Sequence, residues 1–335
     1  MTPLAVGIVG GGWIARRHVP TIDAAEGVEL VAACDTDLAR AQAIAGPRRA
    51  RSYRHWEEML DRESLDALWV CTPPLLHRDP VVAAVESGIH VYLEKPIART
   101  LADGEAIAGA AARSEGICVV GYQWHASELL DLVREAASDQ SIGMLVGRNY
   151  GPVAGRPWFI DRAQGGGQVL ERGSHHIDLQ RALAGEISAV EAVGGSVRLT
   201  GLRSRADIED VVALTFHFCS GALGSVSIAW TPDGQPELYS LDVIAGDASI
   251  WLELGPQEFR ARGMAGGTPL DATYGDPFER SVARFIEVVR SGRRDRVFCT
   301  PENALRTLNV ALACEKALAQ GEAIALADHD QPPSA

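Results

Sequence analysis

The sequence lacks the features that mark proteins of membranes and nucleic acids. It contains no uninterrupted apolar run of about 18 residues, so no ordinary transmembrane helix is expected. It also lacks an excess of positive charge, because 44 acidic residues outnumber 31 Lys and Arg residues and give a formal net charge of −13. Nucleic acids and anionic membrane surfaces attract basic patches, so we expect neither as a partner. A small neutral substrate fits this charge better.

Paired cysteines and an export signal are also missing. The six cysteines show no C-x-x-C spacing and fall mostly in apolar stretches, which predicts buried, reduced thiols. We therefore expect no cysteine-based metal site. The first strand begins without a charged segment or a cleavage site, and Arg16-Arg17 lies inside an expected helix rather than ahead of an apolar segment. A cytoplasmic protein is expected.

The N-terminus joins a short apolar run to the pattern G-x-G-x-x-A, which is typical of dinucleotide-binding turns. Gly10 allows a tight turn out of the strand, Gly12 allows the backbone to approach a pyrophosphate, and Ala15 lets the next helix pack closely. Trp13 and Ile14 open that helix, whose free N–H groups and positive dipole end attract phosphates. Glycine-rich turns also occur in ordinary loops, so the pattern needs support from its context.

Asp35 stands where such a fold places the acid that binds the adenosine ribose. It ends a second apolar run, 28–34, and follows Ala15 by 20 residues. A carboxylate at this position binds ribose hydroxyls and repels a 2′-phosphate, which favours NAD over NADP. Arg40, one helical turn further on, leaves NADP possible. The alternative interpretation of Asp35 is a solvated acid in a β-to-α turn.

A hydrophobic content of 47% is enough to bury a sizeable core, and the length of 335 residues predicts two domains. Strand signals alternate with helical signals through residues 1–121, which predicts a Rossmann domain, an α/β fold with a doubly wound parallel sheet. The strands are expected near 4–9, 28–34, 66–71, 89–93 and 117–121.

A different pattern begins at residue 122, where consecutive strands predict an α+β domain with a largely antiparallel open sheet over 122–326. Its strands are expected near 144–150, 190–199, 211–218, 222–230, 239–245 and 248–254. Its helices are expected at about 127–137, 174–183, 277–291 and 301–320. The last helix is placed to pack back on the first domain, and 327–335 reads as a frayed tail.

Polar residues follow two strands of the first domain at their carboxyl ends, where open α/β sheets bind ligands. Thr72, Pro73 and His77 follow one strand, and Glu94 and Lys95 follow the next. We assign all five to the cofactor site. Lys95 is also suited to hold a substrate hydroxyl and stabilise charge on its oxygen, although a plain surface Lys–Glu pair is the alternative. His77 is expected to pack or hydrogen-bond rather than transfer protons.

These motifs together resemble the glucose-fructose oxidoreductase, inositol dehydrogenase and rhizopine-catabolism (Gfo/Idh/MocA) family of NAD(P)-dependent oxidoreductases. The resemblance covers nearly the whole chain and rests on the glycine turn, Thr72-Pro73 with His77, Glu94-Lys95-Pro96 and the stretch 165–178. It implies a dehydrogenase that acts on a secondary alcohol of a sugar, cyclitol or related polyol. It also implies a homodimer or homotetramer formed through the open sheet of the second domain.

In the family, a glycine-rich loop leads into a helix that carries an acid and, four residues later, a histidine. Here Glu171 and His175 occupy these positions, and residues four apart share one face of an α-helix. The resemblance makes His175 the general base. Many members carry aspartate in place of Glu171, so the role of this residue departs from the pattern. His176 is expected to point elsewhere; without the resemblance, both histidines read as ordinary helix-start residues.

Three further residues are assigned to the substrate site beside Lys95 and His175. Family members often carry an arginine near the position of Trp124 or His125, so the substrate contacts of this chain are expected to differ there. Trp124 and Trp158 offer aromatic faces that suit a sugar ring, although tryptophans in such loops also simply pack.

The implied reaction uses histidine as the base, because its ordinary pKa lies near working pH. His175 takes the hydroxyl proton, the carbon gives its hydride to the nicotinamide, and Lys95 polarises the oxygen. Two alternatives remain under the same fold. One is an NAD-dependent glycosidase that oxidises its substrate only transiently; the other is a non-catalytic dinucleotide sensor, which has no need of these two residues.

Overall fold

The computed structural model describes residues 3–137, 141–153, 157–197, 207–231, 237–255 and 258–326. Contacts divide the chain into two compact units. Unit 1 comprises Met1–Ala126 and Pro277–Leu305, and unit 2 comprises Ser127–Asp276 and Arg306–Ala335. Helix α9 (Pro277–Ser291), which the sequence places in the second domain, thus belongs to unit 1, and α10 (Pro301–Gln320) runs from one unit into the other. The expected frayed tail, 327–335, lies outside the described residues.

Unit 1 is built on a parallel sheet, which confirms the predicted doubly wound α/β fold. Its six described strands follow the order β3-β2-β1-β4-β5-β6, which reverses direction at the β1/β4 pair. Ligands bind at such a switch point in open α/β sheets. The strands are β1 (Leu4–Val9), β2 (Val28–Cys34), β3 (Arg51–Tyr53), β4 (Ala67–Val70), β5 (His90–Leu93) and β6 (Cys118–Val120).

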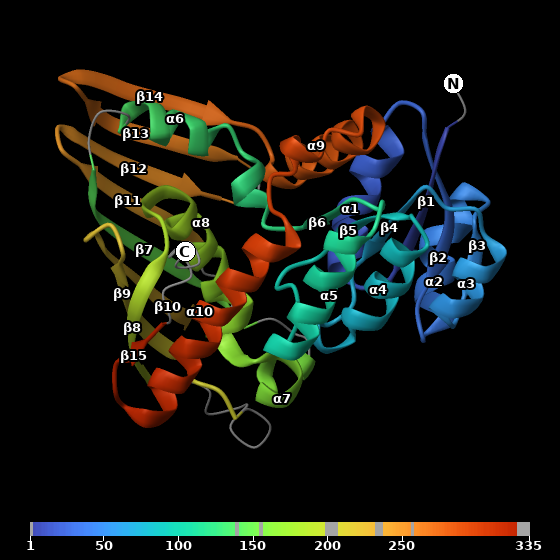
Figure 1. Cartoon of the computed structure of the whole chain (residues 1–335), viewed down its shortest axis with the longest axis horizontal. Coiled ribbons are helices and arrows are strands. Elements are labelled where there is room, and N and C mark those ends of the chain that lie inside the picture. Colours follow the sequence, from blue (N-terminus) through green and yellow to red (C-terminus); the bar gives the residue numbers. More distant parts are fainter. Residues whose placement is uncertain are drawn as a thin grey trace, which may run out of the picture. The chain divides into compact units, whose positions relative to one another are not determined.

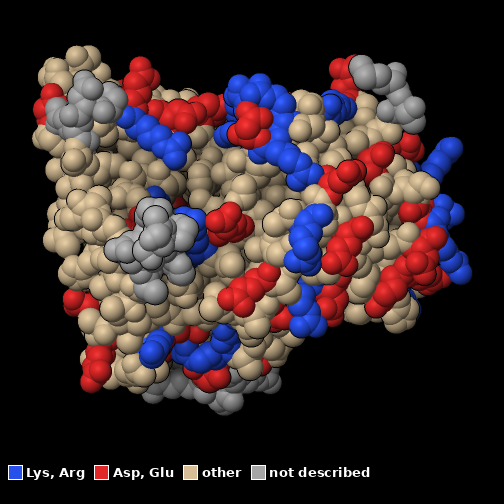
Figure 2. Space-filling model, in the orientation of Figure 1, with Lys and Arg blue, Asp and Glu red and all other residues tan. Residues whose placement is uncertain are grey.

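Helices cover both faces of this sheet. They are α1 (Trp13–Ala24), α2 (Leu38–Ala45), α3 (Trp56–Arg62), α4 (Arg78–Glu86), α5 (Leu101–Arg113) and α9. Helices α4 and α5 lie side by side, and α1 packs against α9 (Figure 1). Basic and acidic side chains alternate over α4 and α5 in Figure 2. Arg78 of α4 pairs with Asp103 of α5. In the core, the Trp69 ring stacks on Tyr92 at 5.7 Å and meets Phe285 edge-on at 5.0 Å.

Unit 2 contains a second, largely antiparallel sheet, as predicted. Its described strands follow the order β14-β13-β12-β11-β7-β10-β9-β8-β15, and the β7/β10 pair is parallel. The strands are β7 (Ile142–Pro152), β8 (Ile187–Gly195), β9 (Val211–Phe218), β10 (Leu223–Thr231), β11 (Leu238–Ala245), β12 (Ala248–Leu254), β13 (Phe259–Ala265), β14 (Thr268–Tyr274) and β15 (Ile324–Ala325). The sequence analysis did not anticipate β13, β14 or β15.

Helices cover one face of the second sheet, since α8 (Ser174–Ala184) packs on β7 and α6 (Leu129–Ala136) packs on β13. A short helix, α7 (Arg162–Gly165), precedes α8. Several apolar side chains on the opposite strand positions stay exposed: Met144, Leu223, Leu238, Ile244 and Met264. In the part of the chain that the structure describes, no helix has the length and apolar character needed to cross a membrane.

Candidate functional site

The glycine turn after β1 has the geometry that a dinucleotide needs. Gly10 adopts a φ of +92°, and a Cβ there would lie 2.7 Å from the carbonyl carbon of Cys71, so only glycine fits. A Cβ on Gly12 would meet no described atom within 4 Å. Gly12 is also the N-cap residue of α1; within the described residues no side chain caps this helix, and its first turn carries no acid. An open, uncapped helix start suits a pyrophosphate group.

Gly11 contributes a close approach that the sequence analysis missed. A Cβ on this residue would lie only 3.0 to 3.2 Å from Arg40 atoms, so the turn packs tightly against α2. Its N–H donates to Asp35 Oδ2 at 2.7 Å, while Asp35 Oδ1 accepts from the Asp37 N–H at 2.9 Å. The carboxylate of Asp35 is therefore fixed beside the glycine turn, the position expected for a ribose-binding acid.

Two arginines border this acidic loop. Arg40 pairs with Asp37 at 3.4 Å on the surface, and an Arg54 guanidinium nitrogen donates to the Thr36 carbonyl at 3.2 Å. The sequence analysis named Arg40 as a residue that leaves NADP possible. It did not name Arg54, which lies far from Asp35 in the sequence and belongs to no motif. The loop thus holds the Asp35 carboxylate against the glycine turn, with the positive charges of Arg40 and Arg54 nearby.

His77 links the two loops that follow β4 and β5. Its ring is fully buried, with Nε2 2.8 Å from the Thr72 carbonyl oxygen and Nδ1 3.2 Å from the Ile97 carbonyl oxygen. Burial lowers the pKa of His77 below its usual range, although the carbonyl contacts oppose this shift. A neutral ring carries one N–H, so it donates to one of these two carbonyls and packs against the other, which positions the loops of Thr72 and Ile97 rather than exchanging protons with solvent.

Glu94 and Lys95 follow β5 but face different surroundings. Glu94 is only 5% exposed, and its Oε1 lies 2.6 Å from His18 Nε2 on α1. Its Oε2 accepts from the Lys95 N–H at 3.2 Å. Lys95 is partly exposed, precedes a cis peptide bond to Pro96, and is one of only two lysines in the chain. The sequence analysis missed His18, although its spacing from the other buried residues of α1 gave a signal.

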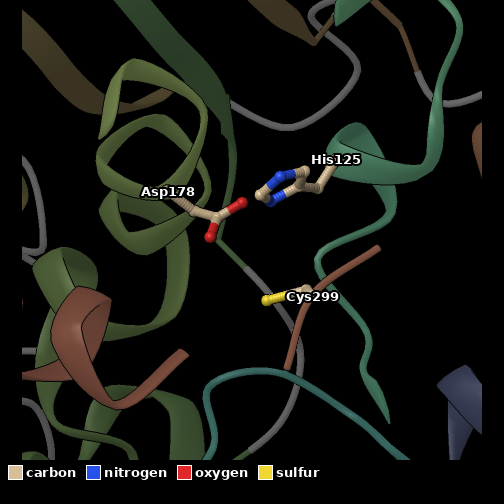
Figure 3. Close-up of side chains that lie close together, drawn as sticks. All are labelled: His125, Asp178 and Cys299. Atoms are coloured by element: carbon tan, nitrogen blue, oxygen red, sulfur yellow. The ribbon is translucent and has the colours of Figure 1, made fainter. Parts of the chain in front are cut away.

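The segment after β6 borders the same edge of the sheet, because the Gly121 N–H donates to the Leu93 carbonyl at 2.7 Å. Trp124 in this segment is 5% exposed and packs inside unit 1. His125 is partly exposed, and one of its ring nitrogens lies within 4.8 Å of Cys299 Sγ (Figure 3). Of the two residues, His125 is thus the more exposed.

In unit 2, the stretch that carries Glu171 is not the α-helix that the sequence analysis assumed. Val169–Gly173 forms a π-helical turn, and α8 begins only at Ser174. Glu171 is 8% exposed within the π turn, and His175 is partly exposed in the first turn of α8. A π turn closes i→i+5 hydrogen bonds, so α-helical spacing no longer assigns Glu171 and His175 to one face. Such turns are frequent at functional sites.

His176 faces the sheet, whereas the sequence analysis expected only that it points elsewhere than His175. Its ring is fully buried, Nε2 lies 3.1 Å from the Ser240 carbonyl oxygen, and burial lowers its pKa to about 4. Gly147 on β7 makes room for it, since a Cβ there would lie 2.5 Å from the His176 ring. Consecutive residues on a helix point about 100° apart. His175 therefore faces away from this contact.

A series of side-chain hydrogen bonds connects α8 to α10 within unit 2. Asp178, which projects from α8 in Figure 3, accepts from the Thr307 hydroxyl at 3.3 Å. Thr307 in turn accepts from Arg181 Nη1 at 2.7 Å, and Arg181 Nε and Nη2 both donate to the Glu186 carboxylate. Asp178 lies three residues after His175, on the same helix face. Sequence spacing alone gave no sign of Thr307.

Trp158 packs in unit 2 beside Phe159, with ring centroids 5.6 Å apart. Phe159 belongs to a small buried apolar cluster with Ile160, Ile208 and Trp230, and Trp158 packs against this cluster. The Trp158 side chain is partly buried, so at least one face of its ring is covered by these neighbours.

Comparison with known proteins finds a family model that matches part of each unit. Residues 4–122 match the family model of an oxidoreductase family with an NAD-binding Rossmann fold. Residues 140–250 match the model of the GFO/IDH/MocA C-terminal domain. The two matches together span more than half of the chain.

Curated relatives align over most of their length. A levoglucosan dehydrogenase of Pseudarthrobacter phenanthrenivorans is 25% identical over 290 residues, covering 75% of this chain and 73% of its own. A 1,5-anhydro-D-fructose reductase of Ensifer adhaerens is 26% identical over 329 residues, covering 95% and 97%. The crystal structure of an aldose-aldose oxidoreductase from Caulobacter crescentus shares the fold, with a TM-score of 0.84, 24% identity and coverage of 97% and 100%.

Proposed function

Because this chain belongs to the Gfo/Idh/MocA family of oxidoreductases, we propose that it interconverts a secondary alcohol and a ketone on a sugar, cyclitol or related polyol. The relatives named for levoglucosan and 1,5-anhydro-D-fructose support a carbohydrate substrate. The observation that carries the proposal is Lys95, which follows β5 at the sheet edge where the glycine turn follows β1. A lysine beside a dinucleotide site is suited to polarise the oxygen of an alcohol.

We assign the steps to residues as follows. Bound NAD supplies the hydride acceptor. Lys95 donates a hydrogen bond to the substrate oxygen and stabilises the charge that develops on it. His175 accepts the hydroxyl proton, and Glu171 supports this transfer from the adjoining π turn. His125 binds a further substrate hydroxyl, whereas Trp124 and Trp158 shape the surroundings mainly by packing.

The test is a substrate panel of inositols, free sugars, sugar acids and aryl glycosides, each incubated with NAD while NADH absorbance is followed. Accumulating NADH on a polyol or free sugar supports the dehydrogenase. Consumption of a glycoside without NADH accumulation favours the redox-neutral glycosidase. Dinucleotide binding with no turnover across the panel favours a sensor, and either of the last two results contradicts the proposal.

We propose that Asp35 sets the preference for NAD over NADP. Replacing Asp35 with asparagine keeps an acceptor for the Gly11 N–H but removes the charge that repels a 2′-phosphate. We expect NADH binding to weaken about tenfold and the gap between NADH and NADPH affinity to narrow by at least as much. Fluorescence titration with each cofactor measures both effects.

Asp37→Asn is the matched control for NADH affinity, because it removes the same charge two residues away; since it also frees Arg40 from its pair with Asp37, its effect on NADPH is left out of the comparison. Asp37 caps α2 by accepting from the Ala39 N–H rather than binding the glycine turn. Equal changes of NADH affinity in both variants, or an unchanged preference in Asp35→Asn, would remove Asp35 from the ribose site.

We propose that the uncovered face of the second sheet binds a second copy of this chain, giving a homodimer or homotetramer. Met144 and Ile244 pair across β7 and β11 on this face, and both are more than two-fifths exposed. Exposed apolar side chains clustered on one sheet face are typical of subunit interfaces. Light scattering should show an oligomer that Ile244→Asp dissociates and Leu76→Asp, an exposed position of unit 1, does not. A monomeric wild-type protein would contradict this assignment.

A further inference from the structure

A buried His–Glu pair joins the start of unit 1 to the loop that carries Lys95. His18 lies on α1 with 0% exposure, Glu94 follows β5 with 5% exposure, and their nearest side-chain atoms are 2.6 Å apart. Aromatic rings enclose the histidine, since Tyr92 meets it edge-on at 5.0 Å and Phe278 at 5.9 Å. Burying two polar groups in an apolar surrounding is costly unless each is paired, so their contact is strongly favoured.

The surroundings of His18 indicate which of its two ring nitrogens carries the proton. His18 Nδ1 is buried and has no hydrogen-bond partner among the described residues. A proton on Nδ1 would therefore be an unsatisfied buried donor, which is unfavourable. We therefore assign the proton to Nε2, from which His18 donates to Glu94 Oε1. This charge-assisted bond orients Glu94 through one of its two oxygens.

The second oxygen of Glu94 reaches Lys95. Oε2 accepts from the Lys95 backbone N–H at 3.2 Å, at the point where the chain leaves β5. The Glu94 N–H is itself bound to the Val70 carbonyl at 2.9 Å, so the strand ends in a fixed position. The loop beyond it is held by the Glu94 side chain, and that side chain is held by His18.

We propose that His18 is a positioning residue for Lys95, acting through the carboxylate of Glu94. Helix α1 begins at the glycine turn, so the same rigid element that binds the pyrophosphate fixes the orientation of the Lys95 loop. This inference rests on the proposed function for the role of Lys95. It assigns no proton transfer to His18.

Two substitutions separate positioning from simple packing. His18→Gln retains a donor at nearly the position of Nε2, whereas His18→Met has similar bulk but no donor. We expect His18→Met to lower kcat about 10- to 100-fold while substrate KM and NADH affinity stay within about threefold, because a misplaced catalytic group costs rate more than binding. We expect His18→Gln to restore most of the rate.

Amide hydrogen exchange tests the link without any catalysis. In His18→Met the Lys95 amide should exchange at least about tenfold faster than in the wild type, and His18→Gln should reverse this, while strand β4 stays protected in both. Unchanged Lys95 exchange in His18→Met would overturn the proposal, as would a glutamine variant as defective as the methionine variant. Should the wild type turn over no alcohol, the proposed function fails but the exchange result still decides whether His18 holds the loop.

Discussion

Replacing Lys95 with methionine is expected to lower kcat by about 10²- to 10³-fold while NADH affinity stays near the wild-type value. Methionine preserves much of the side-chain length but removes the charge and all three N–H donors. The loss falls on kcat because the developing charge on the substrate oxygen exists mainly in the transition state. Steady-state kinetics on the substrate found in the panel, with a separate NADH titration, measures both quantities.

Lys316→Met is a matched control, since Lys316 is the other lysine of the chain and lies exposed on α10. It should leave kcat and NADH affinity unchanged. A Lys95→Met protein that keeps wild-type kcat would show that another group polarises the oxygen. A variant that loses NADH binding instead would make Lys95 a cofactor residue without a catalytic role.

The second large effect is expected for His175→Asn, which keeps a polar side chain but cannot accept a proton at working pH. Removing a general base typically costs about 10²- to 10⁴-fold in rate. In the oxidative direction, the wild-type rate should rise with pH as the base loses its proton, and the variant should lose this rise. Rate profiles against pH for both proteins measure the difference.

His217→Asn is the control for this variant, because His217 is a half-exposed residue of β9 paired with Glu191 at 3.1 Å. It should preserve both the rate and the pH profile. If His175→Asn retains turnover with an unchanged profile, the base is another residue, and Glu171 is the next to test. If only KM changes, His175 binds the substrate without taking its proton.

Elements with strong local signals were predictable from the sequence to their end residues. Helices α9 and α10 have the predicted bounds, 277–291 and 301–320. A proline opens each helix, and the glycine after each one, Gly292 and Gly321, adopts a positive φ that ends it. In both helices the proline and the glycine stand at the ends that the sequence analysis predicts.

Elements without such signals escaped the sequence analysis. Strand β3 has only three residues, and β13 and β14 carry charged or small residues instead of an apolar alternation. Their pairing in the sheet, with β13 between β12 and β14, stabilises them instead. Tertiary pairing of this kind cannot be read from local composition.

In the candidate site, too, residues with a local sequence signal were predictable, whereas contacts between residues far apart in the sequence were not. The positions of the glycine turn, Asp35 and Lys95 could be predicted from their spacing and from the ends of the strands that precede them. Each position is determined by residues close to it in the sequence. The contact of His18 with Glu94 and that of Asp178 with Thr307 join residues 76 and 129 positions apart, respectively. The π turn at Glu171 changes helical spacing in a way that an assumed α-helix could not reveal.

The most direct test of the central claim is the transfer of deuterium from a polyol or sugar labelled at its carbinol carbon. Incubation with NAD, followed by mass spectrometry of the nucleotide, reports whether the carbon–hydrogen bond is broken and where the hydride goes. The dehydrogenase proposed here predicts deuterated NADH that accumulates with the ketone and that Lys95→Met and His175→Asn both suppress. Unlabelled nucleotide, or deuterium that returns to a cleaved glycoside, would contradict it.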